Sequence, residues 1–169
     1  MELVRDLYVF CCFTGLSFTD MKNLTKDNVQ TSFDGKLWIM TKRQKTGVES
    51  NIMLMDIPLR IIEKYDGMAK ENYLLPVPQY ITACKNLKTI IGLCGIEKNI
   101  TWHTSRHTMA TEICLTNGVP IETLSKMLGH TNIRTTQIYA KITHEKESRD
   151  MNSLSDKLSR IEQFSGITI

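Results

Sequence analysis

The sequence predicts an α+β domain that is mainly α-helical and carries one small three-stranded antiparallel sheet. Apolar residues recur at helical spacing over most of the chain. The period changes only between residues 29 and 57, where short β-prone runs alternate with turn residues. The chain has 169 residues, 41% of them hydrophobic and 23% charged, which is enough for one globular domain with its own core. We therefore expect a single domain over residues 1–169.

Two helices are expected before the sheet. Residues 2–14 place their apolar side chains on one broad face at helical spacing, and Gly15 is expected to end that helix. Ser17 or Thr19 is suited to cap a second helix, in which Asp20 lies favourably near the positive end of the helix dipole. A helix–turn–helix is therefore expected at the start of the chain.

Three short β-prone runs form the expected sheet, at residues 29–33, 36–41 and 51–57. They are separated by an Asp-Gly pair at 34–35 and by Lys-Thr-Gly at 45–47, which are turn sequences typical of hairpins. Consecutive strands joined by tight turns pair in antiparallel fashion, so we expect an antiparallel sheet.

The remainder of the chain is expected to be helical. Proline, glycine and asparagine mark the limits of several of these segments. The expected helices cover residues 58–67, 78–94, 106–117 and 120–128, followed by a short helix that Asn132 caps and that carries Tyr139, and by an amphipathic tail segment at 154–164.

Composition excludes several classes of protein. No apolar run reaches the roughly 18 residues that a membrane helix needs. The first residues lack the basic and apolar regions of a signal peptide. The five cysteines are odd in number and show no Cys-x-x-Cys spacing, which favours reduced core thiols. We therefore expect a cytoplasmic protein without a membrane partner.

Charge alone leaves the partner open. The net charge of +3 permits a nucleic-acid partner but does not require one. Residues 35–48 hold four basic side chains and no acid. Such a run is either a solvated face or a DNA contact.

The side chains that carry chemistry cluster late in the chain. Three of the four histidines, His103, His107 and His130, lie between residues 103 and 130, together with Arg106. Tyr139 follows shortly after. The candidate functional residues of the chain therefore lie in this segment.

The order of these residues resembles the motifs of tyrosine recombinases of the phage integrase family. The resemblance rests on His-x-x-Arg-His at 103–107, Leu-Gly-His at 128–130 and the nucleophilic Tyr139. Thr-Gly-Leu at 14–16 and Lys45 extend it, so that it spans residues 1–142, and it is similar to integrases of conjugative transposons in particular. The complete set of motifs in this order is specific for the family, whereas any one motif alone would be weak evidence.

The resemblance implies the tyrosine recombinase catalytic-domain fold. Residues 1–142 would be the catalytic core, and residues 143–169 a C-terminal tail helix that either docks on a neighbouring protomer or packs on its own domain. It also implies that the N-terminal core-binding domain is absent from this chain. The isolated domain is expected to be a monomer, and a homo-tetramer is expected on synapsed DNA.

The implied activity is site-specific recombination or integration of double-stranded DNA. Tyr139 would attack a phosphodiester to give a 3′-phosphotyrosine, and the strand would be rejoined without ATP, cofactor or metal. Attack builds negative charge on the phosphate oxygens, which rigidly held donors stabilise. Arg106 offers a two-pronged fork to that phosphate, and His103 and His130 act as donors or proton shuttles. Lys45, at the hairpin turn, would be the general acid that protonates the leaving 5′ oxygen.

One position departs from the family. Its members usually have an arginine directly after Thr-Gly-Leu, where this chain has Ser17. A serine donates one hydrogen bond but brings no charge, and charge-assisted bonds are roughly twice as strong. Either another arginine replaces it, for which Arg5 on the preceding helix is a candidate, or the domain is impaired. Similar integrases of conjugative transposons also carry a small residue here, so we interpret Ser17 as a family variation.

Alternatives stay open from the sequence. The chain could be a DNA-binding accessory module that lost catalysis through Ser17, or a metal-dependent hydrolase built on His103, His107 and His130. The metal hypothesis lacks the Glu of a His-Glu-x-x-His motif. His107 is either a structural histidine or a phosphate ligand, and Lys45 is either the general acid or an ordinary turn lysine.

Overall fold

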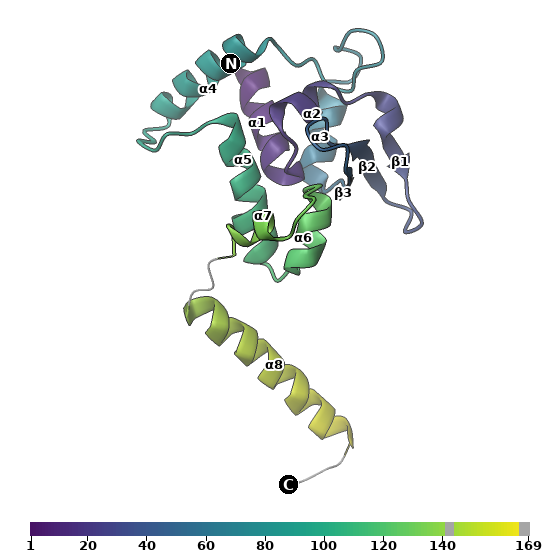
Figure 1. Ribbon diagram of the computed structural model, residues 1–169, viewed down its shortest axis with the longest axis vertical. Coiled ribbons are helices and arrows are strands. Elements are labelled where there is room, and N and C mark those ends of the chain that lie inside the picture. Colours follow the sequence, from purple (N-terminus) through teal and green to yellow (C-terminus); the bar gives the residue numbers. More distant parts are fainter. Residues whose placement is uncertain (141–143, 166–169) are drawn as a thin grey trace. The chain divides into compact units, whose positions relative to one another are not determined.

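The computed structural model describes the main chain of residues 1–140 and 144–165 and the side chains of 1–140, 148 and 150–159 (Figure 1). The chain forms two compact units, Met1–Tyr139 and Ala140–Ile169. The expected end of the catalytic core, residue 142, lies outside the described residues, as does the side chain of every residue after 159.

The first unit is mainly helical and holds one sheet. Its helices are α1 (Glu2–Thr14), α2 (Phe18–Lys22), the short 3-10 helix η1 (Lys26–Asn28), α3 (Asp56–Lys64), α4 (Tyr80–Leu93), α5 (Trp102–Thr108), the π-helix η2 (Met109–Leu115), α6 (Ile121–Met127) and α7 (Arg134–Gln137). Its strands are β1 (Val29–Thr31), β2 (Leu37–Lys42) and β3 (Glu49–Met53), antiparallel in the order β1-β2-β3. The described part of the second unit is α8 (His144–Ser165). The expected fold class is confirmed.

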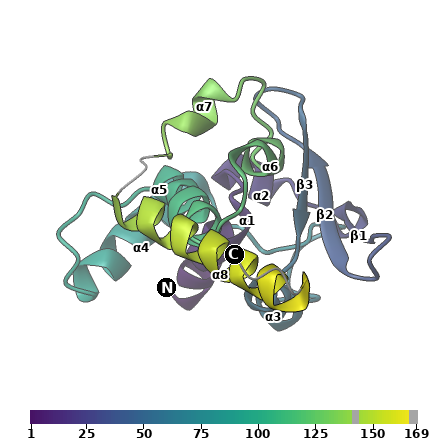
Figure 2. The ribbon, with the colours of Figure 1, turned by 90° about the horizontal axis from the view of Figure 1, so that it is seen from below.

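Helix α1 is the centre of the first unit. It contacts α3, α4 and α5, and its residues Leu7, Phe10 and Cys11 are fully buried. The sheet lies to one side of these helices, as the two ribbon views show (Figures 1 and 2). Ile39 of β2 and Ile52 of β3 stand opposite each other and are both buried, so the sheet presents an apolar face to the core.

The third strand begins and ends earlier than expected. The sequence predicted residues 51–57, but β3 covers Glu49–Met53. Two causes combine. The hairpin turn is tight, because Arg43 N donates to the carbonyl of Val48 at 2.9 Å. The next helix starts at Asp56, since Pro58 fits its first turn, where a backbone N–H is not needed.

The helix that carries Arg106 also begins earlier than expected. The sequence predicted residues 106–117, but α5 starts at Trp102. Thr101 and Thr104 form a capping box there, in which each side chain accepts from the other residue's backbone N–H. His103, Arg106 and His107 therefore share one helix, with the two histidines one turn apart.

The prediction that Tyr139 lies on a short helix capped by Asn132 was wrong. Helix α7 ends at Gln137, and its N-cap is Ile133. The Asn132 side chain instead accepts from Arg134 N at 2.9 Å, which is a local turn before the helix. Tyr139 follows the helix, where its backbone N–H donates to the carbonyl of Thr136 at 3.0 Å.

Gly15 ends α1 as expected, with a φ of 68°. A Cβ at this position would lie 2.7 Å from Leu128 Cδ2 and 3.1 Å from Met109 Cγ. We expect Gly15→Ala to lower the free energy of unfolding by about 2–4 kcal/mol, from a left-handed backbone penalty and overpacking together. Urea unfolding measures the loss.

Gly35→Ala is the matched control for that prediction. Gly35 has a similar φ of 73°, but nothing lies within 4 Å of its ideal Cβ. Gly35→Ala should therefore lower the free energy of unfolding only by the left-handed backbone penalty, about 1–2 kcal/mol. Equal losses in the two variants would show that Gly15 makes no close packing contact.

No helix among residues 1–140 and 144–165 has the length and apolar character needed to cross a membrane.

Candidate active site

Arg106 is a buried arginine held by the main chain. Its side chain leaves α5, and its Nη1 donates to the carbonyl of Gly15 at 2.6 Å. Its Nη2 donates to the carbonyl of Leu128 and lies 3.0 Å from His130 Nε2. These three contacts use three of the five guanidinium N–H groups, and a further interaction joins the guanidinium to the Tyr139 side chain. The turns after α1 and α6 thus hold the Arg106 guanidinium in place.

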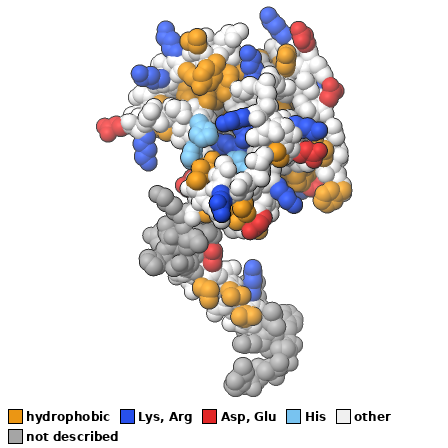
Figure 3. Space-filling model, viewed as in Figure 1, with side chains coloured by type: hydrophobic (Ala, Val, Ile, Leu, Met, Phe, Trp, Pro, Cys, Tyr) orange, Lys and Arg blue, Asp and Glu red, His pale blue; other side chains and the backbone are white. Residues whose placement is uncertain are grey.

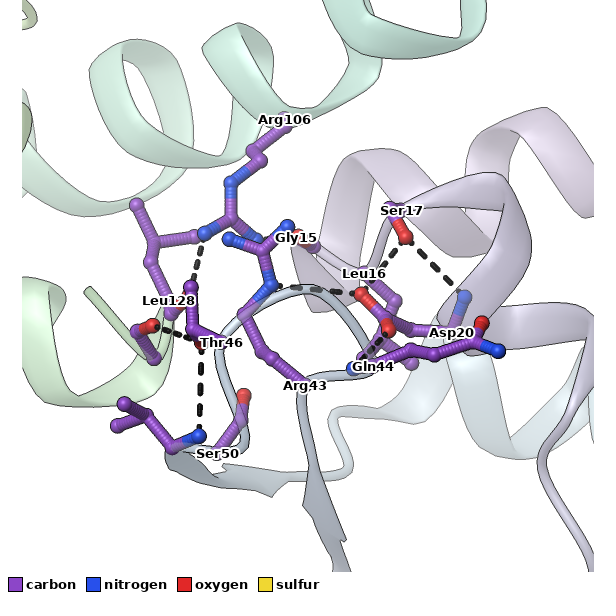
Figure 4. A network of polar contacts seen from close by, with 12 residues as sticks. Gly15, Leu16, Ser17, Asp20, Arg43, Gln44, Thr46, Ser50, Arg106 and Leu128 are labelled. Carbon is purple, nitrogen blue, oxygen red and sulfur yellow. Dashed lines mark hydrogen bonds and ion pairs between the residues drawn. The ribbon is translucent and has the colours of Figure 1, made fainter. Parts of the chain in front are cut away.

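A second arginine, Arg43, meets Arg106 from the hairpin that joins β2 and β3. Figure 4 shows its guanidinium between Arg106 and Asp20. Arg43 Nε lies 3.4 Å from Asp20 Oδ2, and the side chains of both are largely buried. A Cβ at Gly129 would lie 2.8 Å from Arg43 Cγ and Cδ, so the Leu-Gly-His segment leaves room for the arginine stem. The sequence did not single out Arg43, although it lies in the basic run at 35–48.

Asp20 ties the hairpin to the start of α2. Its Oδ1 accepts from Gln44 N at 3.0 Å, while its Oδ2 accepts from the Ser17 hydroxyl at 2.7 Å. Ser17 Oγ also accepts from Asp20 N at 3.1 Å, which confirms Ser17 as the cap of α2. The Ser17 hydroxyl is thus committed to Asp20, and Asp20 positions both the hairpin and Arg43 (Figure 4).

The hypothesis that Arg5 replaces the missing arginine was wrong. Arg5 Nη2 lies 2.7 Å from Asp6 Oδ1 and 3.4 Å from Glu2 Oε1, and its side chain is 56% exposed. It also lies ten residues from Gly15 on α1, a rise of about 15 Å along the helix. The neighbouring acids on α1 hold Arg5 away from Arg106, whereas Arg43 lies close enough to Arg106 to lower its pKa.

His130 is neutral and held at both ring nitrogens. Burial, followed by the charges of Arg106 and Arg43, lowers the pKa of His130 to about 4. Because an Arg106 N–H donates to Nε2, the proton of the neutral ring sits on Nδ1 and is donated to Thr136 Oγ1 at 2.8 Å. Thr136 is fully buried, and its hydroxyl fixes the orientation of the His130 ring. Sequence reasoning predicted His130 but missed Thr136.

His103 and Lys45 lie at the open side of the site. Partial burial lowers the pKa of His103, and so do the charges of His107, Arg106, Arg43 and Lys45. Lys45 is exposed in the hairpin turn, beside Thr46, whose hydroxyl donates to the carbonyl of Gly129 at 3.3 Å. The hairpin therefore brings Lys45 within electrostatic range of His103.

Tyr139 is buried beside the Arg106 guanidinium. Its side chain is 7% exposed and packs with the small apolar cluster around Met109 and Leu124. Burial and Arg43 lower the pKa of Arg106 to about 10, whereas Tyr139 and Asp20 oppose that shift. The His130 ring lies nearly parallel to the Tyr139 ring, at an interplanar angle of 14° and 6.5 Å between centroids. The structure thus brings Tyr139, Arg106 and His130 together.

A cavity of about 390 Å³ opens beside these residues. It is lined by Ser17, Phe18, Thr19, Lys22, Tyr80, Trp102, His103 and Arg106. On the face seen in Figure 3, histidine side chains lie next to lysine and arginine side chains. The cavity therefore gives solvent and ligands access to the buried guanidinium.

The charges around Arg106 favour an anion. Arg43 lies close enough to Arg106 to lower its pKa, and Arg43 pairs with the one nearby carboxylate, Asp20, at 3.4 Å. Like charges held this close repel, and a bound anion relieves that repulsion. A phosphate has oxygens that can accept hydrogen bonds from both guanidinium groups.

A metal site on the histidines finds no support in the described residues. No three His, Cys, Asp or Glu side chains among them converge in a way that would hold a metal ion. Both ring nitrogens of His130 already have partners.

We expect Thr136→Val to slow the reaction expected of Tyr139 about ten-fold. The substitution leaves the His130 Nδ1–H without a hydrogen-bond partner, so the His130 ring can rotate. Thr136→Ser keeps the hydroxyl and should react at nearly the wild-type rate. Thr135→Val, at the exposed neighbouring position, is the control. A Thr136→Val rate equal to that of Thr135→Val would contradict the role of Thr136. Single-turnover rates with a DNA substrate make the comparison.

Comparison with known proteins supports this picture. Residues 4–146 match the model of the phage integrase family. A tyrosine recombinase from Pseudothermotoga lettingae is 29% identical over 163 residues, which cover 90% of this chain and 53% of that protein. The chain spans about half or less of the length of the curated relatives it matches.

Two solved structures show the fold. The XerH site-specific recombinase, bound to its palindromic difH substrate in a post-cleavage complex, is 20% identical with a TM-score of 0.66 over 90% of this chain and 45% of that chain. The Tn1549 transposon integrase with a circular intermediate DNA is 17% identical with a TM-score of 0.65 over 88% of this chain and 58% of that chain. The fold is that of the tyrosine recombinase catalytic domains. The chain belongs to the phage integrase family.

Proposed function

We propose that this chain is the catalytic domain of a site-specific DNA recombinase that cuts and rejoins strands through a phosphotyrosine at Tyr139. The observation that carries the proposal is the buried phenol of Tyr139 beside the Arg106 guanidinium, with the charge of Arg43 close by. A phenol and a phosphate-binding pair of this kind are what attack on a phosphodiester needs. Membership of the family supports the same chemistry.

The scissile phosphate would bind between Arg106 and Arg43. Arg106 would turn its remaining N–H capacity towards the phosphate oxygens, and Arg43 would add a second positive charge from the hairpin. His103 would add a hydrogen-bond donor, and the unprotonated Nε2 of neutral His130 would serve as a proton acceptor. Because Arg43 would supply the charge that Ser17 lacks, the serine by itself no longer argues for the accessory-module alternative.

Cleavage would then be a direct displacement at phosphorus. The Tyr139 oxygen forms a bond to phosphorus, the bond from phosphorus to the 5′ oxygen breaks, and the 3′ phosphate stays on the tyrosine. The phenol proton passes to one of the neutral imidazoles. The bond energy is kept in the phosphotyrosine ester, so the reverse attack by a 5′-hydroxyl rejoins the strand without ATP.

Lys45 is proposed as the general acid for the leaving 5′ oxygen. We expect Lys45→Ala to lower the cleavage rate at least about 100-fold on ordinary DNA. A substrate with sulfur at the 5′ bridging position should restore most of that rate, because a thiol with a pKa near ~8.5 leaves as its anion. Lys42→Ala, on the same hairpin, is the control. If sulfur fails to rescue Lys45→Ala, Lys45 has another role.

The partner is proposed to be double-stranded DNA, with four protomers on a synapsed pair of sites. Helix α8 supports assembly, because Met151, Leu154 and Leu158 are exposed at helical spacing on one face. Replacing Leu154 and Leu158 with serine should abolish the complex of four protomers on DNA, while binding of a single protomer persists.

A DNA-cutting protein with five free cysteines would act in the reducing cytoplasm.

The test is covalent trapping at low salt on a pool of short nicked duplexes of random sequence. The nick lets the short 5′-hydroxyl product diffuse away, so the phosphotyrosine accumulates and is seen on a denaturing gel. A band that forms equally with and without a chelator, and that Tyr139→Phe abolishes, supports the proposal. Bound DNA without a band would favour the accessory module, and loss of cleavage with the chelator would favour the metal hydrolase.

A further inference from the structure

His107 is the histidine of the site that the proposed chemistry leaves without a task. It lies on the exposed face of α5, one turn after His103. The side chain of its neighbour Arg106 points inward and donates to the main chain, whereas the side chain of His107 leaves the helix on the exposed side. Its ring meets the Tyr139 ring at an interplanar angle of 80°, with 4.9 Å between centroids.

These contacts form a row of four rings. His103 meets His107 at 88° and 5.0 Å, His107 meets Tyr139, and Tyr139 lies nearly parallel to His130. The nucleophile is thus contacted by one imidazole from α5 and by another from the Leu-Gly-His segment. The T-shaped geometry of the His107 contact is one that aromatic pairs prefer.

The backbone around Tyr139 does little to hold its ring. Tyr139 follows α7, a helix of four residues, and its neighbours Gln137 and Ile138 are exposed. Its backbone N–H makes a local bond to Thr136. The position of the phenol therefore depends on what its ring touches, and His107 is the nearer of the two imidazoles that contact it from outside the apolar cluster.

We propose that His107 is a positioning residue for the nucleophile, which holds the Tyr139 ring edge-to-face so that the phenol stays beside Arg106. The inference rests on the proposed function and adds a residue to it. The ring is what matters in this role, because a T-shaped contact needs an aromatic partner rather than a charge. An aromatic substitute should therefore serve, whereas a phosphate ligand would need the imidazole nitrogens.

The first arm of the test measures cleavage. With saturating DNA, His107→Ala should form the covalent complex about 3- to 10-fold more slowly, and His107→Phe should come within about two-fold of wild type. In a Tyr139→Phe background, His107→Ala should leave DNA affinity unchanged. Glu112→Ala, exposed on the next turn of the helix, is the control for a surface change.

The second arm needs no DNA. The five tyrosines are labelled as 3-fluorotyrosine, and the Tyr139 signal is assigned through Tyr139→Phe. In wild type and His107→Phe this ¹⁹F signal should be displaced from that of the free amino acid by the neighbouring rings, and in His107→Ala it should move towards the free value. A purely structural effect would lower thermal stability without this pattern of rescue.

The outcomes separate the two proposals. A His107→Phe variant as slow as His107→Ala, with weaker DNA binding in both, would make His107 a phosphate ligand and overturn the inference. Unchanged rates and signals in His107→Ala would overturn it as well. If the wild type forms no covalent complex at all, the proposed function fails, while the ¹⁹F arm still decides whether His107 positions Tyr139.

Discussion

Arg43→Ala is expected to lower the rate of phosphotyrosine formation by about 100- to 1,000-fold, the usual cost of removing one fixed donor to developing negative charge. The reason is its place beside Arg106, where it supplies the charge that Ser17 does not. Arg43→Lys should recover part of the loss, because a lysine brings charge without the fork. Single-turnover cleavage measures all three proteins.

Two further variants make this prediction specific. Arg5→Ala, which removes an exposed arginine from α1, should cleave at the wild-type rate. Ser17→Arg in the Arg43→Ala background should restore activity in part, since the side chain of residue 17 borders the same cavity as Arg106. Circular dichroism shows whether Arg43→Ala is folded. A folded Arg43→Ala that cleaves like wild type would remove Arg43 from the site.

Arg106→Ala is expected to abolish detectable cleavage and also to destabilise the fold, by about 2–4 kcal/mol. The two effects have one origin. The guanidinium satisfies the carbonyls of Gly15 and Leu128 and also faces the ligand, so its loss leaves two buried acceptors without a donor. Urea unfolding and covalent trapping measure the two effects separately.

Arg106→Lys and Arg60→Ala complete that comparison. A lysine keeps the charge but has too few fixed donors to bond both carbonyls and the phosphate, so cleavage should stay at least about 100-fold below wild type. Arg60 is an exposed arginine on α3, and its loss should change neither stability nor rate. Normal stability in Arg106→Ala would contradict the structural part of this account.

The parts of the fold that could be predicted have strong local signals. Helix α1 and its end at Gly15 follow from apolar spacing and one left-handed glycine. The start of α5 was missed because its capping box uses two threonines, Thr101 and Thr104, rather than the commoner pairing with Glu or Gln. Tyr139 was placed on a helix because its motif says nothing of where α7 ends.

Local sequence patterns predict only part of the candidate site. Tyr139, Arg106 and His130 were predicted from the motifs, and the structure brings them together. Arg43 could not be assigned from the sequence, because its neighbour Arg106 lies far along the chain and the contact depends on Asp20 fastening the hairpin to α2. The error over Arg5 was avoidable, since two acids on its own helix are placed to pair with it.

The measurement that tests the central claim most directly is the identification of the residue that becomes linked to DNA. The trapped complex is digested with nuclease and protease, and the peptide that carries a nucleotide is sequenced by mass spectrometry. The account predicts a single modified residue, Tyr139, joined to a 3′ phosphate. A nucleotide on any other residue, or a trapped band that survives Tyr139→Phe, would contradict it.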